Sequence, residues 1–448
     1  MCIFVPNIYA MVTMMKRTID IFRLAQTARH PMKRYELDTI GHLYASTISD
    51  KYTPIFRLQA NLHDAVDAAL LQRAVDDLRV RYPYLYVGLK KGVFSSHLEE
   101  SDEQLKAVFE QASPLQMMSH EEVGHFCMRI LYGERYIAIE VVHVLTDGCG
   151  ARLFLTALLR RYLELQGRLR GEESLAHPAK EVPLEKKVED AYARHAGQVM
   201  RRPKGEKVFR PVCTFVDGNR KTITVVTIPS EQLLEKAHGY GVTVTTLLTT
   251  VLTDTLIEMQ DRMVTGGLKR RIAVGLAVDA RNILGSQTMR NFSVETSLGL
   301  APAQTGLSFE EKCLEIDRQL KERTKKAYIQ TLVSEYVAGM RNPVVRCIPS
   351  VIKDRLIDYL YAKKSVEGAC TCLSNLGNMN LPEDMSPYIG NVYFSMGAER
   401  ILPANCCVVS FMGSTNICFT RTIEESAIED GFIRRLEEMG MKIGYGYD

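Results

Sequence analysis

The sequence has no long run of apolar residues and no excess of charge of one sign. A helix that spans a bilayer needs about 20 consecutive apolar residues, and no segment reaches that length, so we expect no integral membrane segment. Lysine and arginine total 56 against 53 aspartates and glutamates, which gives a formal net charge of +3. Proteins dedicated to nucleic acid concentrate positive charge, so this balance argues against nucleic acid as a partner.

Several signatures of common enzyme classes are also absent. The chain contains neither the G-x-S-x-G sequence of a serine hydrolase nor the G-x-x-x-x-G-K-[ST] loop of a P-loop nucleotide hydrolase. His120 and His125 lie in a stretch that resembles a metalloprotease helix, but they are five positions apart and do not share a helical face. We therefore predict no metal site.

The 11 cysteines form no metal-binding or disulfide framework. Cys370 and Cys372, and likewise Cys406 and Cys407, are too close together for a paired C-x-x-C zinc site. An odd number of cysteines scattered over a long chain is typical of reduced thiols. We therefore expect a cytoplasmic protein.

The composition that remains, 46% hydrophobic and 24% charged residues, is that of a globular protein. The N-terminal residues differ from the rest of the chain in composition. Residues 1–12 are apolar and uncharged, and Lys16 and Arg17 follow them, whereas a signal peptide carries its positive charges first. We predict that residues 1–31 are a non-structural extension, with Met14, Met15 or Met32 as alternative starts.

Strand and helix patterns alternate through both halves of the remaining chain. The first half predicts strands at residues 54–62, 84–90, 125–132 and 135–144 and helices at 66–81 and from 150 to about 166. The second half predicts strands at 221–228, 271–278, 371–375, 391–396, 406–412 and 415–421, with helices opening near 230 and covering 245–259, 308–326 and 424–439.

Between these halves, residues 167–210 are rich in charge and carry Pro178, Pro183 and Pro203, as expected of a connecting segment that is partly helical. At about 150 residues per domain, 448 residues correspond to two or three domains. We predict an N-terminal domain at residues 32–170, a linker at 171–210 and a C-terminal domain at 211–448. Each domain is expected to be an α/β two-layer sandwich.

The most specific feature is the sequence V-H-V-L-T-D-G at residues 142–148, where a predicted strand ends and a helix begins. His143 shares the strand parity of Ile137, Ile139 and Val141, so its imidazole ends an apolar row. A dry neighbourhood favours the neutral ring. A neutral imidazole can take a proton from a hydroxyl, amine or thiol near pH 7, which makes His143 a candidate general base.

Asp147 and Gly148 follow at the turn into the helix. A carboxylate at that position can cap the helix or pair with a cation, and a glycine permits close approach of other backbone. We assign both residues to structural support of His143 and not to proton transfer.

This H-x-x-x-D-G pattern resembles the signature of the chloramphenicol acetyltransferase-like superfamily, which includes coenzyme A-dependent acyltransferases, alcohol acetyltransferases and nonribosomal peptide condensation domains. The family motif often has a second histidine directly before the first. Val142 stands there in this chain, as in many acyltransferase members that have one histidine. Further segments resemble the family in the expected order, from residue 35 to the C-terminus: Y-P-Y-L at 82–85, V-D-A-R at 278–281, R-N-F at 290–292 and S-N-L-G at 374–377.

The resemblance implies two similar domains that meet at a tunnel with His143 midway along it. An acyl-coenzyme A, as co-substrate and not as a permanently bound cofactor, enters one mouth and the acceptor enters the other. His143 deprotonates the acceptor, which attacks the thioester directly. The resemblance also implies that Arg281 pairs with Asp147 and that Ser374 or Asn375 donates to the oxyanion.

We therefore predict a monomeric acyltransferase that moves an acyl group, acetyl included, to an alcohol hydroxyl or an amine. Two other functions stay open: a stand-alone condensation-type domain that takes its acyl group from a carrier protein, and a non-catalytic protein that binds a hydrophobic ligand. A basic cluster could meet the phosphates of coenzyme A or belong to a solvated linker; its members are Arg201, Arg202, Lys204, Lys207 and Arg210.

Overall fold

A computed structural model describes residues 32–49, 52–169, 182–198, 206–216, 220–342, 347–350, 352–357, 359, 368–398 and 402–446. The predicted extension at residues 1–31 lies outside the described residues. So do residues 171–181 and 199–205 of the predicted linker, and with them Arg201, Arg202 and Lys204 of the basic cluster.

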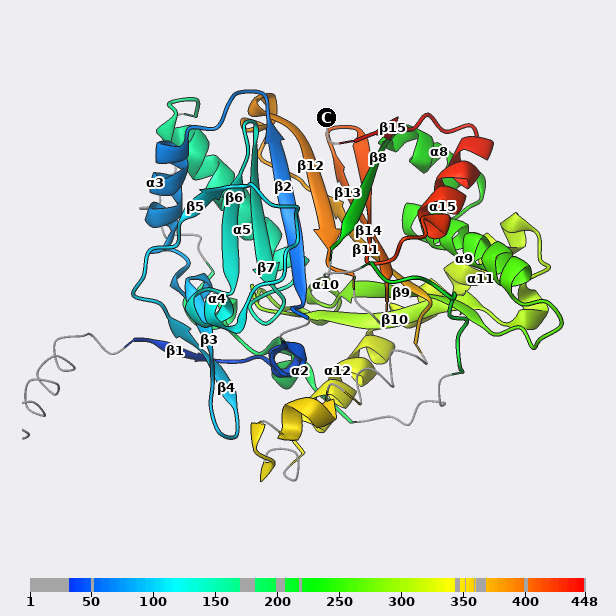
Figure 1. Ribbon diagram of the computed structural model, residues 1–448, viewed down its shortest axis with the longest axis horizontal. Coiled ribbons are helices and arrows are strands. Elements are labelled where there is room, and N and C mark those ends of the chain that lie inside the picture. The colour runs from blue at the N-terminus through cyan, green and yellow to red at the C-terminus, as the bar shows by residue number, and fades with distance from the viewer. Residues whose placement is uncertain are drawn as a thin grey trace, which may run out of the picture.

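Five strands form the sheet of the N-terminal half, in the order β12-β2-β7-β6-β5. The strands β2 (Ile55–Leu62), β7 (Tyr136–Val142) and β6 (Met128–Tyr132) are antiparallel neighbours, and β5 (Ala107–Phe109) pairs with β6 in parallel. The helices α3 (Ala68–Leu78) and α5 (Gly148–Leu165) pack together and cover one face of this sheet (Figure 1).

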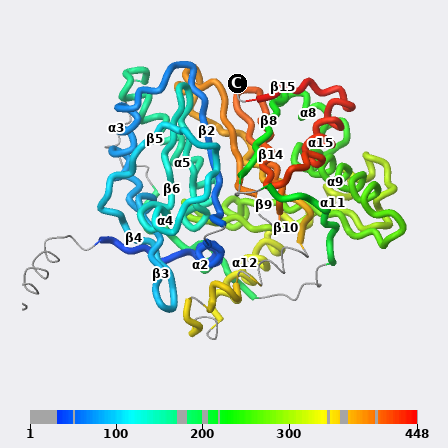
Figure 2. Tube along the Cα trace, in the orientation of Figure 1, coloured from blue at the N-terminus to red at the C-terminus, as the bar shows by residue number. Residues whose placement is uncertain are grey.

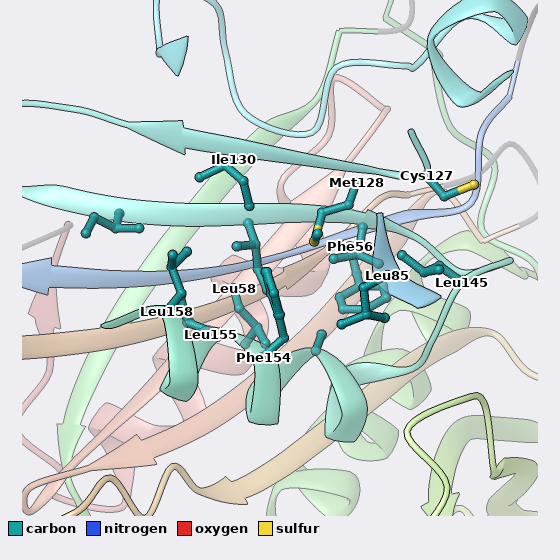
Figure 3. Close-up of a cluster of buried hydrophobic side chains, with 14 of the residues drawn as sticks. Phe56, Leu58, Leu85, Cys127, Met128, Ile130, Leu145, Phe154, Leu155 and Leu158 are labelled. Carbon is teal, nitrogen blue, oxygen red and sulfur yellow. The ribbon is translucent and has the colours of Figure 1, made fainter. Parts of the chain in front are cut away.

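The core between this sheet and α5 is built from alternate strand residues and one stripe of the helix. Phe56 and Leu58 of β2 and Ile130 of β6 meet Phe154 and Leu158 of α5 there (Figure 3). Strand periodicity sends every second side chain to the same face. The motif at residues 142–148 begins at the end of β7, a central strand that is buried on both faces along most of its length.

Smaller elements complete this half of the molecule. The strands β1 (Arg34–Glu36), β4 (Ser96–Glu100) and β3 (Val87–Lys91) form a second sheet, and α2 (Thr39–Thr47) and α4 (His120–His125) flank it. The predicted strand at 84–90 begins later than expected. Pro83 instead starts the single 3₁₀ turn η1 (Pro83–Leu85), because its fixed φ suits the first position of a helical turn.

Seven strands form the sheet of the C-terminal half, in the order β10-β9-β11-β13-β14-β8-β15. Their bounds are β8 (Thr222–Pro229), β9 (Ile272–Asp279), β10 (Ser293–Leu300), β11 (Thr371–Asn378), β13 (Ala404–Phe411), β14 (Ser414–Arg421) and β15 (Gly444–Tyr445). The strand β11 runs parallel to β9 and β13, and the other pairs are antiparallel. The predicted fold class, two mixed α/β bodies, is confirmed.

Four helices of this half gather on one face of its sheet (Figure 1). They are α8 (Ser230–Gly239), α9 (Val244–Met263), α11 (Phe309–Arg323) and α15 (Ala427–Glu438). Among the described residues, no single helix is long and apolar enough to cross a membrane, and the pair α8 and α9 passes that test only jointly, with a bend of 81° between them.

The strand β12 (Ile389–Met396) belongs by sequence to the second half but pairs with β2 of the first, residue 394 opposite residue 58. Figure 2 shows this orange segment alongside the blue β2. Asn416 of β14 donates through Nδ2 to the Val392 carbonyl at 2.7 Å, which ties the strand to the C-terminal sheet as well. A boundary at residue 210 therefore does not separate the two sheets.

A third apolar cluster joins the halves beneath both sheets. It brings α2 together with α7 (Ala191–His195), α10 (Arg281–Leu284) and α12 (Lys326–Met340).

The remaining short elements are α6 (Leu184–Lys187), η3 (Pro302–Gln304) and η4 (Ser386–Tyr388). The helix predicted at 308–326 is α11, which ends at Arg323, and the extended Lys325 separates it from α12, a helix that was not predicted. Part of the predicted linker is thus packed helix.

Candidate active site

The H-x-x-x-D-G motif forms the turn between β7 and α5. The strand ends at Val142, and the next N–H, that of His143, still donates to the Pro54 carbonyl beside β2 at 2.8 Å. Asp147 then caps α5, its Oδ1 accepting from the Gly150 N–H at 3.2 Å. Two regular elements therefore fix the backbone on either side of the imidazole.

The imidazole of His143 packs between two aromatic rings. Tyr44 of α2 stacks on it with ring centroids 4.8 Å apart and an angle of 22° between the planes. Phe56 of β2 lies 4.6 Å away on a tilted plane. The residue as a whole keeps some exposure, whereas its Nδ1 is buried and makes no hydrogen bond. The accessible part of His143 is therefore not Nδ1.

Burial lowers the pKa of His143 from 6.5 to about 4. The carboxylate of Asp147 and the side chain of Asn291 both raise it, but less than burial lowers it. A ring in apolar surroundings disfavours its charged form, and Tyr44 and Phe56 supply those surroundings. The imidazole is therefore neutral at pH 7, which is the state that a general base requires.

Asp147 and Arg281 form a bidentate ion pair between the two halves of the chain. Arg281 donates from Nη1 to Oδ2 and from Nη2 to Oδ1, each at 2.9 Å, and both side chains are buried. The Phe292 N–H donates to Oδ2 at 2.8 Å. Burial alone would raise the pKa of Asp147, but the charge and hydrogen bonds of Arg281 hold it below its ordinary value.

Arg281 uses all five of its N–H donors. Besides Asp147, they reach Asp279 Oδ1 at 2.9 Å, the Thr288 carbonyl at 2.8 Å and the Arg290 carbonyl. One guanidinium therefore holds the loop at residues 288–292 against the motif. The guanidinium of an arginine presents its donors in one plane at fixed angles, which suits a site with several acceptors. The ammonium group of a lysine could not make all of these bonds.

This loop supplies site residues that were not among those predicted. Asn291 donates through Nδ2 to the His143 carbonyl at 2.9 Å and to Asp38 Oδ2 at 3.1 Å. Asp38 in turn caps α2, the helix of Tyr44, by accepting from the Gly41 N–H at 2.6 Å. The sequence held a partial signal for both, since R-N-F follows the arginine segment and an aspartate precedes α2.

The segment S-N-L-G at residues 374–377 runs beside the motif, at the end of β11. A Cβ built on Gly148 would lie 2.7 Å from Leu376 Cδ2, so only glycine allows this approach without rearrangement. Ser374 is buried. Asn375 donates from Nδ2 to Thr245 Oγ1 at 3.1 Å, and this bond would have to be exchanged if Asn375 were to serve as an oxyanion donor.

Two cavities of about 520 and 310 Å³ open beside α2 or its C-terminal end. The larger lies on the far side of α2, where Thr39, His42 and Ser46 line it, whereas Tyr44 of the same helix contacts His143. Neither cavity is lined by His143, so the tunnel stays a prediction. In the part of the chain that the structure describes, no group of His, Cys, Asp and Glu side chains could hold a metal ion.

Comparison with known proteins finds similarity in structure but none in sequence. No protein-family model matches the chain, and no curated protein matches it by sequence. Among solved structures, F. sporotrichioides TRI101 complexed with coenzyme A and T-2 has a TM-score of 0.61 at 9% identity, over 92% of this chain and 99% of that one.

Two further solved structures have the same likeness. The TRI3 trichothecene 15-O-acetyltransferase from Fusarium sporotrichioides has a TM-score of 0.53 at 12% identity, over 91% of this chain and 94% of that one. The epimerization domain from the third module of tyrocidine synthetase B has a TM-score of 0.57 at 12% identity, over 92% of this chain and 98% of that one. The chain thus has the chloramphenicol acetyltransferase-like fold.

We predict that Arg281→Ala lowers the free energy of unfolding by about 3–5 kcal/mol, because it leaves the buried Asp147 carboxylate without its partner. Chemical denaturation measures this. The matched control is Arg318→Ala: Arg318 also makes a bidentate pair, with Glu315 at 2.8 Å, but on an exposed helix face, where solvent screens the pair and little stability is lost with it. Equal losses in the two variants would contradict the role of the ion pair.

Proposed function

We propose that this protein is an acyltransferase that moves an acyl group from acyl-coenzyme A to an alcohol hydroxyl, or to an amine, with His143 as general base. The observation that carries the proposal is the neutral imidazole between Tyr44 and Phe56, held by the Asp147–Arg281 clamp. The fold supports it, since coenzyme A is bound in one solved relative and another is named as an O-acetyltransferase.

In the proposed reaction, the unprotonated Nε2 of His143 accepts the proton of the acceptor hydroxyl as its oxygen attacks the thioester carbonyl. The tetrahedral intermediate then collapses, the carbon–sulfur bond breaks, and the imidazolium returns the proton to the leaving thiolate. The products are an ester and free coenzyme A. Asp147 takes no proton, because its oxygens already accept from Arg281, Phe292 and Gly150.

Direct transfer is favoured over a covalent acyl-enzyme by the state of the thiol that follows the motif in sequence. Cys149 follows the motif, and burial together with the charges of Asp147 and Asp279 raises its pKa to about 12. A thiol attacks as its thiolate, which is scarce at neutral pH with such a pKa. The oxyanion needs a donor, and the loss of one such donor typically costs about 2.7–4 kcal/mol of barrier. Ser374 and Asn375 are the proposed donors.

We predict that His143→Gln lowers kcat by about 100-fold to 10,000-fold, the usual contribution of a positioned general base, and leaves the protein folded. Release of free coenzyme A thiol, followed over a panel of acyl-coenzyme A donors and alcohols, measures the rate. His238→Ala is the control, since His238 is exposed on α8. Transfer by His143→Gln at the rate of the unchanged protein would refute the proposed base.

A second candidate is a condensation-type domain that takes its acyl group from a carrier protein. It is favoured by the likeness to a domain of tyrocidine synthetase B, at the same identity as the acetyltransferase. We expect acyl-coenzyme A to be the better donor, because Val142 replaces the second histidine of the condensation signature. Matched reactions with the same acyl group on coenzyme A and on a carrier phosphopantetheine decide this, and a higher kcat/KM with the carrier favours the second candidate.

The depressed pKa of His143 predicts an acid limb of kcat/KM near pH 4, well below the 6.5 of an ordinary histidine. The imidazole of His143 is unprotonated and can act as the base above its pKa in the folded protein, and this form is lost as the pH falls below that pKa. Circular dichroism at each pH separates this loss from unfolding. Burial also raises the pKa of Asp38 to about 6, so comparison with Asp38→Asn, which lacks that carboxyl group, shows whether a limb near pH 6 belongs to Asp38 or to His143. A limb at pH 6.5 in both proteins would contradict the prediction.

A further inference from the structure

Two buried polar atoms in the candidate site lack hydrogen bonds. They are Nδ1 of His143 and Oδ1 of Asn291. A buried polar group without a partner is costly, and such groups are rare in folded proteins. These two belong to residues that already touch, because Asn291 Nδ2 donates to the His143 carbonyl at 2.9 Å.

The orientation of the Asn291 amide follows from its neighbours. Both hydrogens of Nδ2 have acceptors, one in the His143 carbonyl and one in Asp38 Oδ2. A flipped amide would turn its oxygen toward a carbonyl and a carboxylate, neither of which can donate. Oδ1 is therefore the free end of this side chain, and it can only accept.

We infer that Nδ1 of His143 carries the ring proton and donates it to Oδ1 of Asn291, which leaves the lone pair of the imidazole on Nε2. Asn291 is then a positioning residue: it fixes which tautomer is present, and it holds the ring through both the side chain and the backbone of His143. The inference deepens the proposed function, because only this tautomer offers a base at the accessible side of the ring.

The charges around the ring agree with this assignment. The side chain of Asn291 raises the pKa of His143, as an acceptor facing the ring does and a donor would not. The Thr146 backbone also raises that pKa, and so does the Asp147 carboxylate at the cap of α5. From α2 the ring of Tyr44 stacks on the imidazole, and from β2 the ring of Phe56 packs against it; neither ring carries a charge. The Thr146 carbonyl is thus the competing acceptor, and the experiment must separate it from Asn291.

Imidazole ¹⁵N shifts read the tautomer directly in the full chain labelled with ¹⁵N-histidine, with the His143 signals assigned by their loss in His143→Gln. At pH 7 we expect Nδ1 of His143 to be protonated and Nε2 to be bare. In Asn291→Ala we expect both tautomers to be populated and kcat to fall about tenfold, as the loss of one hydrogen bond predicts, with KM for acyl-coenzyme A unchanged. Asn282→Ala, which removes an exposed amide, is the control.

A charge swap covers the case in which Asn291→Ala does not fold. The double variant Asp38→Asn with Asn291→Asp keeps one amide and one carboxylate in contact and turns the acceptor facing the ring into an anion, although it loses the hydrogen bond from residue 291 to the His143 carbonyl. We expect it to keep the Nδ1–H tautomer and to raise the pKa of His143 by about 1–3 units, as measured by the same shifts during titration.

Three results would overturn the inference: a bare Nδ1 in the unchanged protein, the same tautomer ratio in Asn291→Ala, or an unchanged pKa in the swapped pair. The second would assign the role to Thr146. Because the ¹⁵N shifts need no substrate, an inactive protein with the expected tautomer contradicts only the proposed function. An active protein with the other tautomer contradicts the role of Asn291 and of Nε2 as the base atom, but not acyl transfer itself.

Discussion

The ion pair between Asp147 and Arg281 determines the geometry of the whole candidate site. It joins the start of α5 in one half of the chain to α10 in the other, and both side chains are buried. A buried pair is stable only when its remaining donors and acceptors are also satisfied. Here the guanidinium also binds two loop carbonyls and Asp279. The contacts that offset the cost of burying the two charges therefore also fix the loop at residues 288–292.

The ion pair also governs the protonation of its neighbour. An anion beside an imidazole favours the charged ring, and Asp147 does raise the pKa of His143. Arg281 compensates that anion at 2.9 Å, so the aromatic surroundings of the ring prevail and the imidazole stays neutral. Without Arg281, Asp147 would either favour the imidazolium or take up a proton itself. A neutral base next to a carboxylate is thus possible because the carboxylate is already paired.

Local signals in the sequence located the motif and most of the elements around it. Periodicity is a property of short segments, and β2, β7 and α5 lie close to their predicted ranges. Long-range pairing leaves no such signal. Nothing within β12 indicates that it joins β2, and Tyr44 and Phe56 become neighbours of His143 only through the fold. Asp38 could be read as a helix cap, but its contact with Asn291 spans 253 positions.

That contact explains how a single buried carboxylate supports His143 through two separate neighbours. Asp38 caps α2, which sets the position of Tyr44 against one side of the ring. Its second oxygen accepts from the backbone and the side chain of Asn291, which contacts the His143 carbonyl. Removal of this capping carboxylate would therefore disturb the stacking partner of His143 and the amide of Asn291 together. The precision of such a site arises from shared supports, since each holds more than one group in place.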